Sequence, residues 1–234
     1  MKKLIIFFMA IFIFSSSIIA QAEMPVEDAI QKQQIDKSKE LSAIQNAINA
    51  NSSEPKQFEM TFRNRLQVKE QELSFGTPYK VYIVSRDFIN TIINKKQIAD
   101  LEKSYYLWEV PIIYQGKPID TFQVALFQNK YQIVRLGGYL SPEDIVFSCN
   151  PQMISQVANN NSIKTADTFI HYRVAPFESD YLCFVDGSNE YFYPLGFFGQ
   201  KESFGLSSKT FYSRQQIEEK IEPVVNQWMN HLGR

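Results

Sequence analysis

The chain has 234 residues with 24 basic and 25 acidic side chains, so its formal net charge at neutral pH is −1. A chain with so little net charge has no general electrostatic reason to bind nucleic acid or an anionic membrane surface. Its aromatic content of 14% favours β-structure, because aromatic side chains are enriched in strands. The net charge argues against a nucleic-acid-binding domain, and the aromatic content predicts a globular protein with a substantial sheet.

The first 22 residues have the three parts of a secretory signal. A basic start at residues 2–3 is followed by an apolar run over 4–14 and by the small-residue pattern Ala20-Gln21-Ala22. This arrangement predicts cleavage after Ala22 and a secreted or periplasmic location. The alternative is a membrane anchor that is kept, although the apolar stretch is at the short end of what spans a bilayer.

Cleavage would leave residues 23–234 as one exported domain. This length is sufficient to bury a hydrophobic core without stabilising disulfides or metal ions. A low-complexity stretch at 159–162 makes 159–165 the candidate for an internal subdivision. The two cysteines, Cys149 and Cys183, are predicted to form a disulfide in an oxidising compartment. The alternative is a pair of buried thiols that pack as small apolar residues.

The mature chain begins with a predicted helix over residues 25–50, whose apolar side chains fall near one face. Turn formers at 51–55 end it. Residues 58–69 then alternate between apolar and polar with Asn64 as the one exception, which is typical of a strand with one solvent-exposed face. A strand of this length is expected to curve around the preceding helix.

A second strand is predicted over 79–84 and a short helix over 87–101. The region 105–136 is expected to form a meander of three strands, because two turn sequences, Gln115-Gly116-Lys117 and Gln128-Asn129-Lys130, divide it. Gly137-Gly138 ends this pattern.

The sequence Ser141-Pro142-Glu143-Asp144 predicts the cap and first turn of a helix that runs to about Val157 with an interruption at Pro151. After the 159–162 loop, further strands are predicted, and a glycine-bearing stretch then leads to a final helix from about Ser213, with a kink at Pro223. These strands cover 168–174, 180–185 and 190–194.

Short turns join strands that are neighbours in sequence, so the sheet should be mainly antiparallel. The predicted fold class is therefore α+β: a mainly antiparallel curved sheet packed on an N-terminal helix, with a C-terminal helix. Cystatin-like exported domains have a similar arrangement of a helix inside a curved sheet, and this analogy concerns architecture alone.

Recognisable catalytic, metal and cofactor motifs are missing from the sequence, which contains two histidines, His171 and His231. We therefore predict no cofactor, no metal site and no catalytic residue. The sharpest enzyme hypothesis pairs Cys183 with His171 on adjacent strands. If Ala175 lies opposite Asp180, however, Cys183 shares the apolar face with Ile170, while His171 points to the other side and faces solvent.

Acidic pairs in the turns, Glu178 with Asp180 and Asp186 with Glu190, are interpreted as solvated turn residues. A second hypothesis is a modest basic surface patch. Its residues would be Arg63, Arg65, His171 and Arg173. The simpler alternative is that these side chains lie on a solvated face without binding anything. The aromatic run from Tyr191 to Phe198 is expected to be buried between sheet and helix rather than to bind a ligand.

Three functions remain open. The first is a non-catalytic exported protein that binds a protein or another envelope component, with no nucleic-acid partner and no membrane span after signal cleavage. The second is a hydrolase with a scattered active site. The third is an envelope assembly component that uses an uncovered apolar stripe on residues 26–48 or 217–232.

Overall fold

The computed structural model describes residues 24–34, 42–44, 46–47, 73–84, 90–91, 94, 96–97, 105–138, 140–174, 179–197, 202–203 and 205–232. The predicted signal at 1–22, the predicted strand at 58–69 and most of the predicted helix at 87–101 lie outside these residues. The described strands are β1 (Leu73–Phe75), β2 (Tyr79–Val84), β3 (Tyr106–Tyr114), β4 (Lys117–Phe127), β5 (Lys130–Leu136), β6 (Thr168–Val174), β7 (Ser179–Asp186), β8 (Asn189–Phe197), β9 (Glu202–Ser203), β10 (Leu206–Ser207) and β11 (Tyr212–Ser213). The described helices with full bounds are α1 (Val26–Gln34), α5 (Pro142–Ser148), α6 (Pro151–Asn160) and α7 (Arg214–Leu232).

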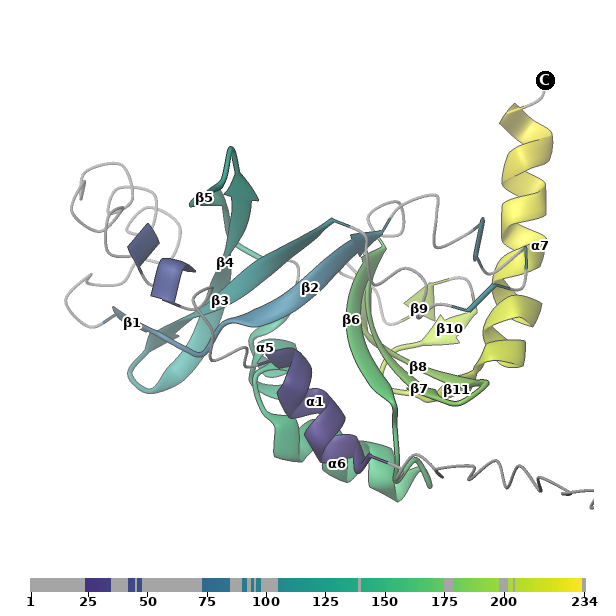
Figure 1. The fold of residues 1–234 in the computed structure, drawn as a ribbon. Helices are drawn as coiled ribbons and strands as arrows, with labels where there is room; N and C mark the ends of the chain where they lie inside the picture. Colours follow the sequence, from purple (N-terminus) through teal and green to yellow (C-terminus); the bar gives the residue numbers. More distant parts are fainter. Residues whose placement is uncertain are drawn as a thin grey trace, which may run out of the picture.

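The described strands form a mixed, mostly antiparallel sheet with the order β11-β8-β7-β6-β2-β3-β4-β5, and β1 pairs with β3 beside this path. Strands β9 and β10 form a separate two-stranded sheet. This sheet and its helices agree with the α+β class predicted from the sequence, and the predicted meander corresponds to β3, β4 and β5 (Figure 1).

The parallel pair β2–β6 joins two antiparallel groups of strands, one made of β2 to β5 and the other of β6 to β8 with β11. Its register matches Tyr82 with Tyr172 and Val84 with Val174. Figure 1 shows that β6, β7 and β8 turn away from the direction of β2 and β3, so the sheet is bent at this junction. Because the two paired strands are about 90 residues apart in sequence, local turn signals did not predict this pairing.

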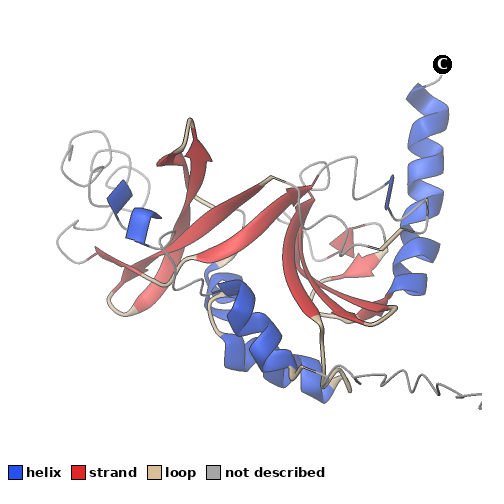
Figure 2. Ribbon diagram, viewed as in Figure 1, coloured by secondary structure: helices blue, strands red, loops and turns tan. Residues whose placement is uncertain are grey.

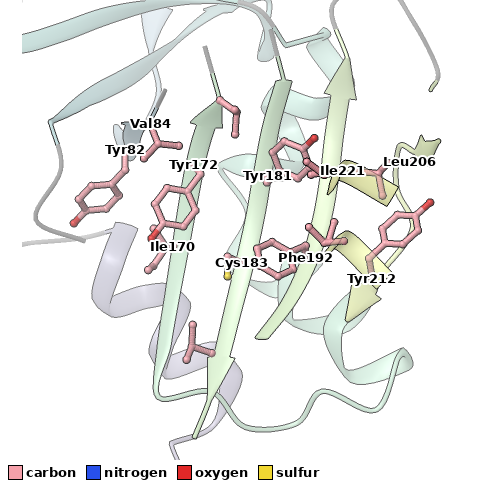
Figure 3. Packing of buried hydrophobic residues seen from close by; sticks show 13 residues of the cluster. Tyr82, Val84, Ile170, Tyr172, Tyr181, Cys183, Phe192, Leu206, Tyr212 and Ile221 are labelled. Carbon is pink, nitrogen blue, oxygen red and sulfur yellow. The ribbon is translucent and has the colours of Figure 1, made fainter. Parts of the chain in front are cut away.

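Helices cover both faces of the β6–β8 group (Figure 2). On one face, α7 contributes Ile217 and Ile221 to a buried cluster with Tyr172, Cys183 and Phe192 (Figure 3). On the other face, α1 and α6 pack on the sheet through a cluster that includes Val26, Ile30, Ile154, Phe169, Leu182 and Phe184. Polar side chains in the middle of these strands, such as His171 and Arg173, are therefore shielded from water.

The helical part of the sequence prediction holds in its main features. Ser141 caps α5, since its Oγ accepts a hydrogen bond from Asp144 N at 3.2 Å, and the interruption at Pro151 separates α5 from α6. The predicted loop at 159–162 was wrong by two residues, because α6 continues to Asn160. The final helix begins at Arg214, one residue after the predicted start.

The predicted helix over 25–50 is described at 26–34 and at parts of 42–47, which are also helical. Ile44 is buried against the β3–β4 face, in a cluster with Trp108 and Phe122. The expectation that the sheet curves around one long N-terminal helix also involves residues outside the described part, so it stays a prediction. Among the described residues, no helix combines the length and hydropathy needed to cross a bilayer.

Candidate functional site

A cluster of charged side chains occupies the core around Arg173, on the face of the sheet that α1 and α6 cover. Arg173 on β6 makes a bidentate pair with Asp180 on β7, in which Nε donates to Oδ1 at 2.7 Å and Nη2 donates to Oδ2 at 2.7 Å. Its Nη1 donates to Glu109 Oε1 on β3. Since β2 lies between β6 and β3, Arg173 reaches across the parallel junction and connects the two strand groups.

Three more polar or aromatic side chains complete this cluster. His171 Nε2 lies 3.0 Å from Asp180 Oδ2, and the two share a hydrogen bond. Gln123 on β4 donates from Nε2 to Glu109 Oε1 at 3.0 Å. The ring of Tyr79 on β2 stacks on the His171 imidazole, with 5.5 Å between the ring centroids and 12° between the planes. We call these six residues the Arg173 cluster.

The charged members of the Arg173 cluster are almost completely removed from water. Glu109 is 0% exposed, Asp180 is 1% exposed, and His171 and Arg173 are each 4% exposed. Burial alone would raise the pKa of Asp180, but the Arg173 guanidinium and the His171 hydrogen bond hold that pKa well below its usual range. Burial likewise opposes the charge of Arg173, but Asp180 and Glu109 raise its pKa above the ordinary value. Both groups are therefore charged and paired in the core.

The hypothesis of a basic surface patch is corrected by this geometry. His171 and Arg173 do lie on the same side of β6, as the alternation predicted, but that side is buried under helices and is not solvated. Arg63 and Arg65 lie outside the described residues. The sequence pattern located the two faces correctly, and the error was to equate a polar face with an exposed one.

The interpretation of the acidic turn residues is also wrong for two of its members. Asp180 is a buried partner of Arg173, and Glu190 is 3% exposed. Arg214, in the first turn of α7, donates from Nη1 to Glu190 Oε2 at 2.6 Å and from Nη2 to the Thr91 carbonyl oxygen at 2.9 Å. This second ion pair fixes the start of α7 to β8 and to the segment at 90–91.

The structure argues against a nucleophilic pair of Cys183 and His171. The observed register places Ile170 opposite Cys183 and His171 opposite Leu182, two residues away from the predicted pairing. A shift of two residues preserves the faces. Cys183 therefore packs in the cluster beneath α7, while His171 lies on the other side with Arg173.

The predicted disulfide is not formed, because Cys149 and Cys183 are both free thiols. Cys149 packs beside Tyr79, Val81 and Leu107, and Cys183 belongs to a different core cluster. Burial, with a contribution from Glu109, raises the pKa of Cys149 to about 12. Burial also raises the pKa of Cys183 well above its ordinary value. Neither thiol has the lowered pKa of an activated nucleophile.

Sequence reasoning missed Glu109, Gln123 and Tyr79 as members of one cluster. A signal for Glu109 did exist: it is an acidic residue inside an otherwise apolar strand. A charge in such a position calls for a buried partner. Its partner Arg173 is 64 residues away, and no local pattern identifies it.

Comparisons of the chain with protein-family models, with curated proteins and with solved structures find no match. The geometry alone therefore has to support the functional argument. Within the described part of the chain, no three His, Cys, Asp or Glu side chains are placed to hold a metal ion. The charged groups of the Arg173 cluster pair with one another, whereas Tyr79 OH and Glu109 Oε2 are buried without a hydrogen-bond partner.

The free thiols give a direct test of the core geometry. We expect both cysteines to react with a thiol reagent at pH 8 after denaturation, and Cys183 to react in the native protein at the rate of unfolding, because it is 0% exposed. Cys149 should react slowly, since a pKa near 12 leaves little thiolate at pH 8. Absence of thiols after denaturation without reductant, or fast native labelling of Cys183 in a Cys149→Ala variant, would contradict this arrangement.

The pairing of Asp180 predicts a specific dependence of stability on pH. Because the pKa of Asp180 is lower in the folded than in the unfolded protein, its contribution is fully present above the unfolded value of about 4 and is lost as pH falls through that value towards the folded one. The Asp180→Asn variant should lose about 3 kcal/mol of unfolding free energy at pH 7. This deficit should shrink as the pH is lowered below about 4 in urea unfolding experiments.

The matched control is Asp28→Asn, which changes an exposed carboxyl on α1 in the same way. Its unfolding free energy should stay within about 0.5 kcal/mol of the unmodified protein at pH 7. Equal effects of the two substitutions, or an Asp180→Asn deficit that is independent of pH, would show that Asp180 is not held as a charged partner of Arg173.

Proposed function

We propose that this chain is an exported, non-catalytic protein that acts by binding a partner in the cell envelope or the extracellular medium. The observation that carries the proposal is the burial of the Arg173 cluster. In the described part of the chain, His171, Asp180 and Glu109 are paired within the Arg173 cluster, and the two thiols have a raised pKa. Groups in this condition stabilise a fold and do not turn over a substrate.

Export is supported by the sequence of residues 1–22. Its basic start, its apolar run and its Ala20-Gln21-Ala22 pattern are those of a cleavable secretory signal. We propose that cleavage leaves Glu23 as the first residue, directly before the segment that leads into α1. The mature protein would then act in the periplasm or outside the cell.

A hydrolase with a scattered active site is the second candidate, and the His171–Asp180 contact is the observation that favours it. An Asp that orients a His is a common part of hydrolytic sites. Catalysis also requires that the imidazole reach a substrate, however, and His171 is 4% exposed between the sheet and its covering helices. The contact is explained better as one part of the Arg173 cluster.

An envelope assembly component is the third candidate. Figure 1 shows α7 extending beyond the strands, whereas the core cluster beneath it includes Ile217 and Ile221 from the first half of the helix. A helix that projects from a folded domain can hold the domain to a larger assembly. This role is one form of the proposed binding function.

The proposal is tested by native mass spectrometry of the untagged protein from its own host, followed by denaturing analysis of the same sample. We expect a chain that begins at Glu23 and a partner retained at a fixed stoichiometry in the native spectrum. The control is a variant with Lys2→Glu and Lys3→Glu, which should keep its full-length mass because the basic start of the signal is lost. A full-length mass for the unmodified protein would contradict export, and a bare monomer would contradict the binding role.

A further inference from the structure

The first described residues of the chain are joined to the segment that leads into β6. Ala166 N donates a hydrogen bond to the Met24 carbonyl oxygen at 3.0 Å, and Val26 N donates to the Lys164 carbonyl oxygen at 3.1 Å. An antiparallel bridge lies between these two hydrogen bonds. The two segments are therefore paired like short strands, and the pairing begins at the second residue after the proposed cleavage point.

Burial of apolar side chains holds the same N-terminal segment in place. Val26, Ala29 and Ile30 of α1 are 1%, 2% and 0% exposed. They belong to the cluster that contains Ile154 and Ala158 of α6, and Figure 1 shows α1 beside α6. Release of this segment would break both hydrogen bonds and expose part of the cluster. Its opening therefore costs free energy, and the closed form dominates in the folded protein.

Signal cleavage requires the opposite condition. The step is hydrolysis of the Ala22–Glu23 peptide bond, in which water supplies the hydroxyl of the new carboxyl group and a proton of the new amine. Proteases cut chain that is exposed and unpaired, or that has opened transiently. Residues 24–26 follow the bond directly, and the folded protein pairs them with 164–166. The peptidase and the segment 164–166 therefore compete for the same stretch of backbone.

We propose that folding of the domain closes its own signal cleavage site. Cleavage after Ala22 proceeds while residues 24–26 are unpaired and stops once they pair with 164–166. The order of these two events then selects between two fates of the chain. Cleavage first gives the exported mature protein, whereas folding first gives a protein that keeps its apolar run at 4–14 and stays at the membrane. The inference rests on the proposed export and adds how that export is controlled.

The test uses the full-length precursor, folded in detergent micelles, and purified signal peptidase from the host. Mass spectrometry follows the appearance of a chain that begins at Glu23. In one variant, about eight flexible Gly and Ser residues are inserted between Glu23 and Met24, which moves the cleavage point up to about 25 Å from the paired segment. We expect this variant to be cleaved at least about tenfold faster than the unmodified precursor, because its cleavage point is exposed without any opening of the fold.

The matched control carries the same insertion between Gln128 and Asn129, in the exposed turn that joins β4 and β5. This insertion leaves the distance from the cleavage point to the paired segment unchanged, so cleavage should be as slow as in the unmodified precursor. In all three precursors the amide hydrogens of Val26 and Ala166 should exchange slowly with solvent, since both are donors in the pairing. Fast exchange of these amides in the unmodified precursor would overturn the inference.

A pair of substitutions tests the closure from the other side. Val26→Asp places a charge in the buried cluster beneath α1 and should speed cleavage, because residues 24–26 then leave the body more often. Gln31→Asp makes the same kind of change at an exposed position of α1 and should leave the cleavage rate unchanged. The insertion variants keep the test decisive if Val26→Asp unfolds the whole domain.

The outcomes also separate this inference from the proposed export. Equal cleavage rates for the unmodified precursor and the Glu23–Met24 insertion variant would overturn closure of the site and leave export intact. Absence of cleavage after Ala22 in every precursor would overturn both. Fast cleavage of the Glu23–Met24 insertion variant beside slow cleavage of the unmodified precursor and of the control insertion would support both.

Discussion

The arrangement of this sheet depends on the ion pairs that the Arg173 guanidinium makes with Asp180 and Glu109. The parallel junction between β2 and β6 has three matched residue pairs, from Tyr82–Tyr172 to Val84–Val174, whereas β6 and β7 match along seven. Arg173 spans this short junction by binding Asp180 on one side and Glu109 on the other. Removal of either acidic partner would leave a buried charge without its full compensation, which is strongly destabilising.

The same ion pairs bear on the function of the protein. A His–Asp contact, an arginine and a glutamate occur together in many active sites. Here they bind one another on the buried face of the sheet that α1 and α6 cover. The pKa shifts of Arg173 and Asp180 favour permanently charged, paired states rather than groups that exchange protons near neutral pH. Exposed large apolar side chains of the described chain include Leu126, Phe127 and Val134 on the β4–β5 hairpin and Val146 and Met153 on α5 and α6.

The sequence predicted local structure well because local signals were strong. The predicted first and last residues of β2 and β6 agree with the observed ones, since turn residues flank each segment. The two faces of β6 were also correct, because a strand keeps its faces when the register moves by two residues. The Ser141 cap and the interruption at Pro151 come from residue types with specific backbone roles.

The candidate site could not be predicted to the same extent, because its geometry is non-local. Nothing within a few residues of His171 indicates that α1 and α6 cover its face, and nothing near Asp180 indicates that Arg173 folds against it rather than leaving it in a solvated turn. The β2–β6 pairing and the contact of Arg173 with Glu109 each join segments far apart in the chain. Compartment and composition also favoured a disulfide, yet the fold places the two cysteines in separate clusters.

A double-mutant cycle between Glu109 and Arg173 measures whether this contact joins the two strand groups. The variants are Glu109→Gln, Arg173→Met and the two combined, each measured by urea unfolding at pH 7. We expect that the losses in the single variants are not additive and that the coupling free energy across the β2–β6 junction is about 1–3 kcal/mol. A coupling free energy near zero would show that the Glu109–Arg173 contact does not hold the two strand groups together.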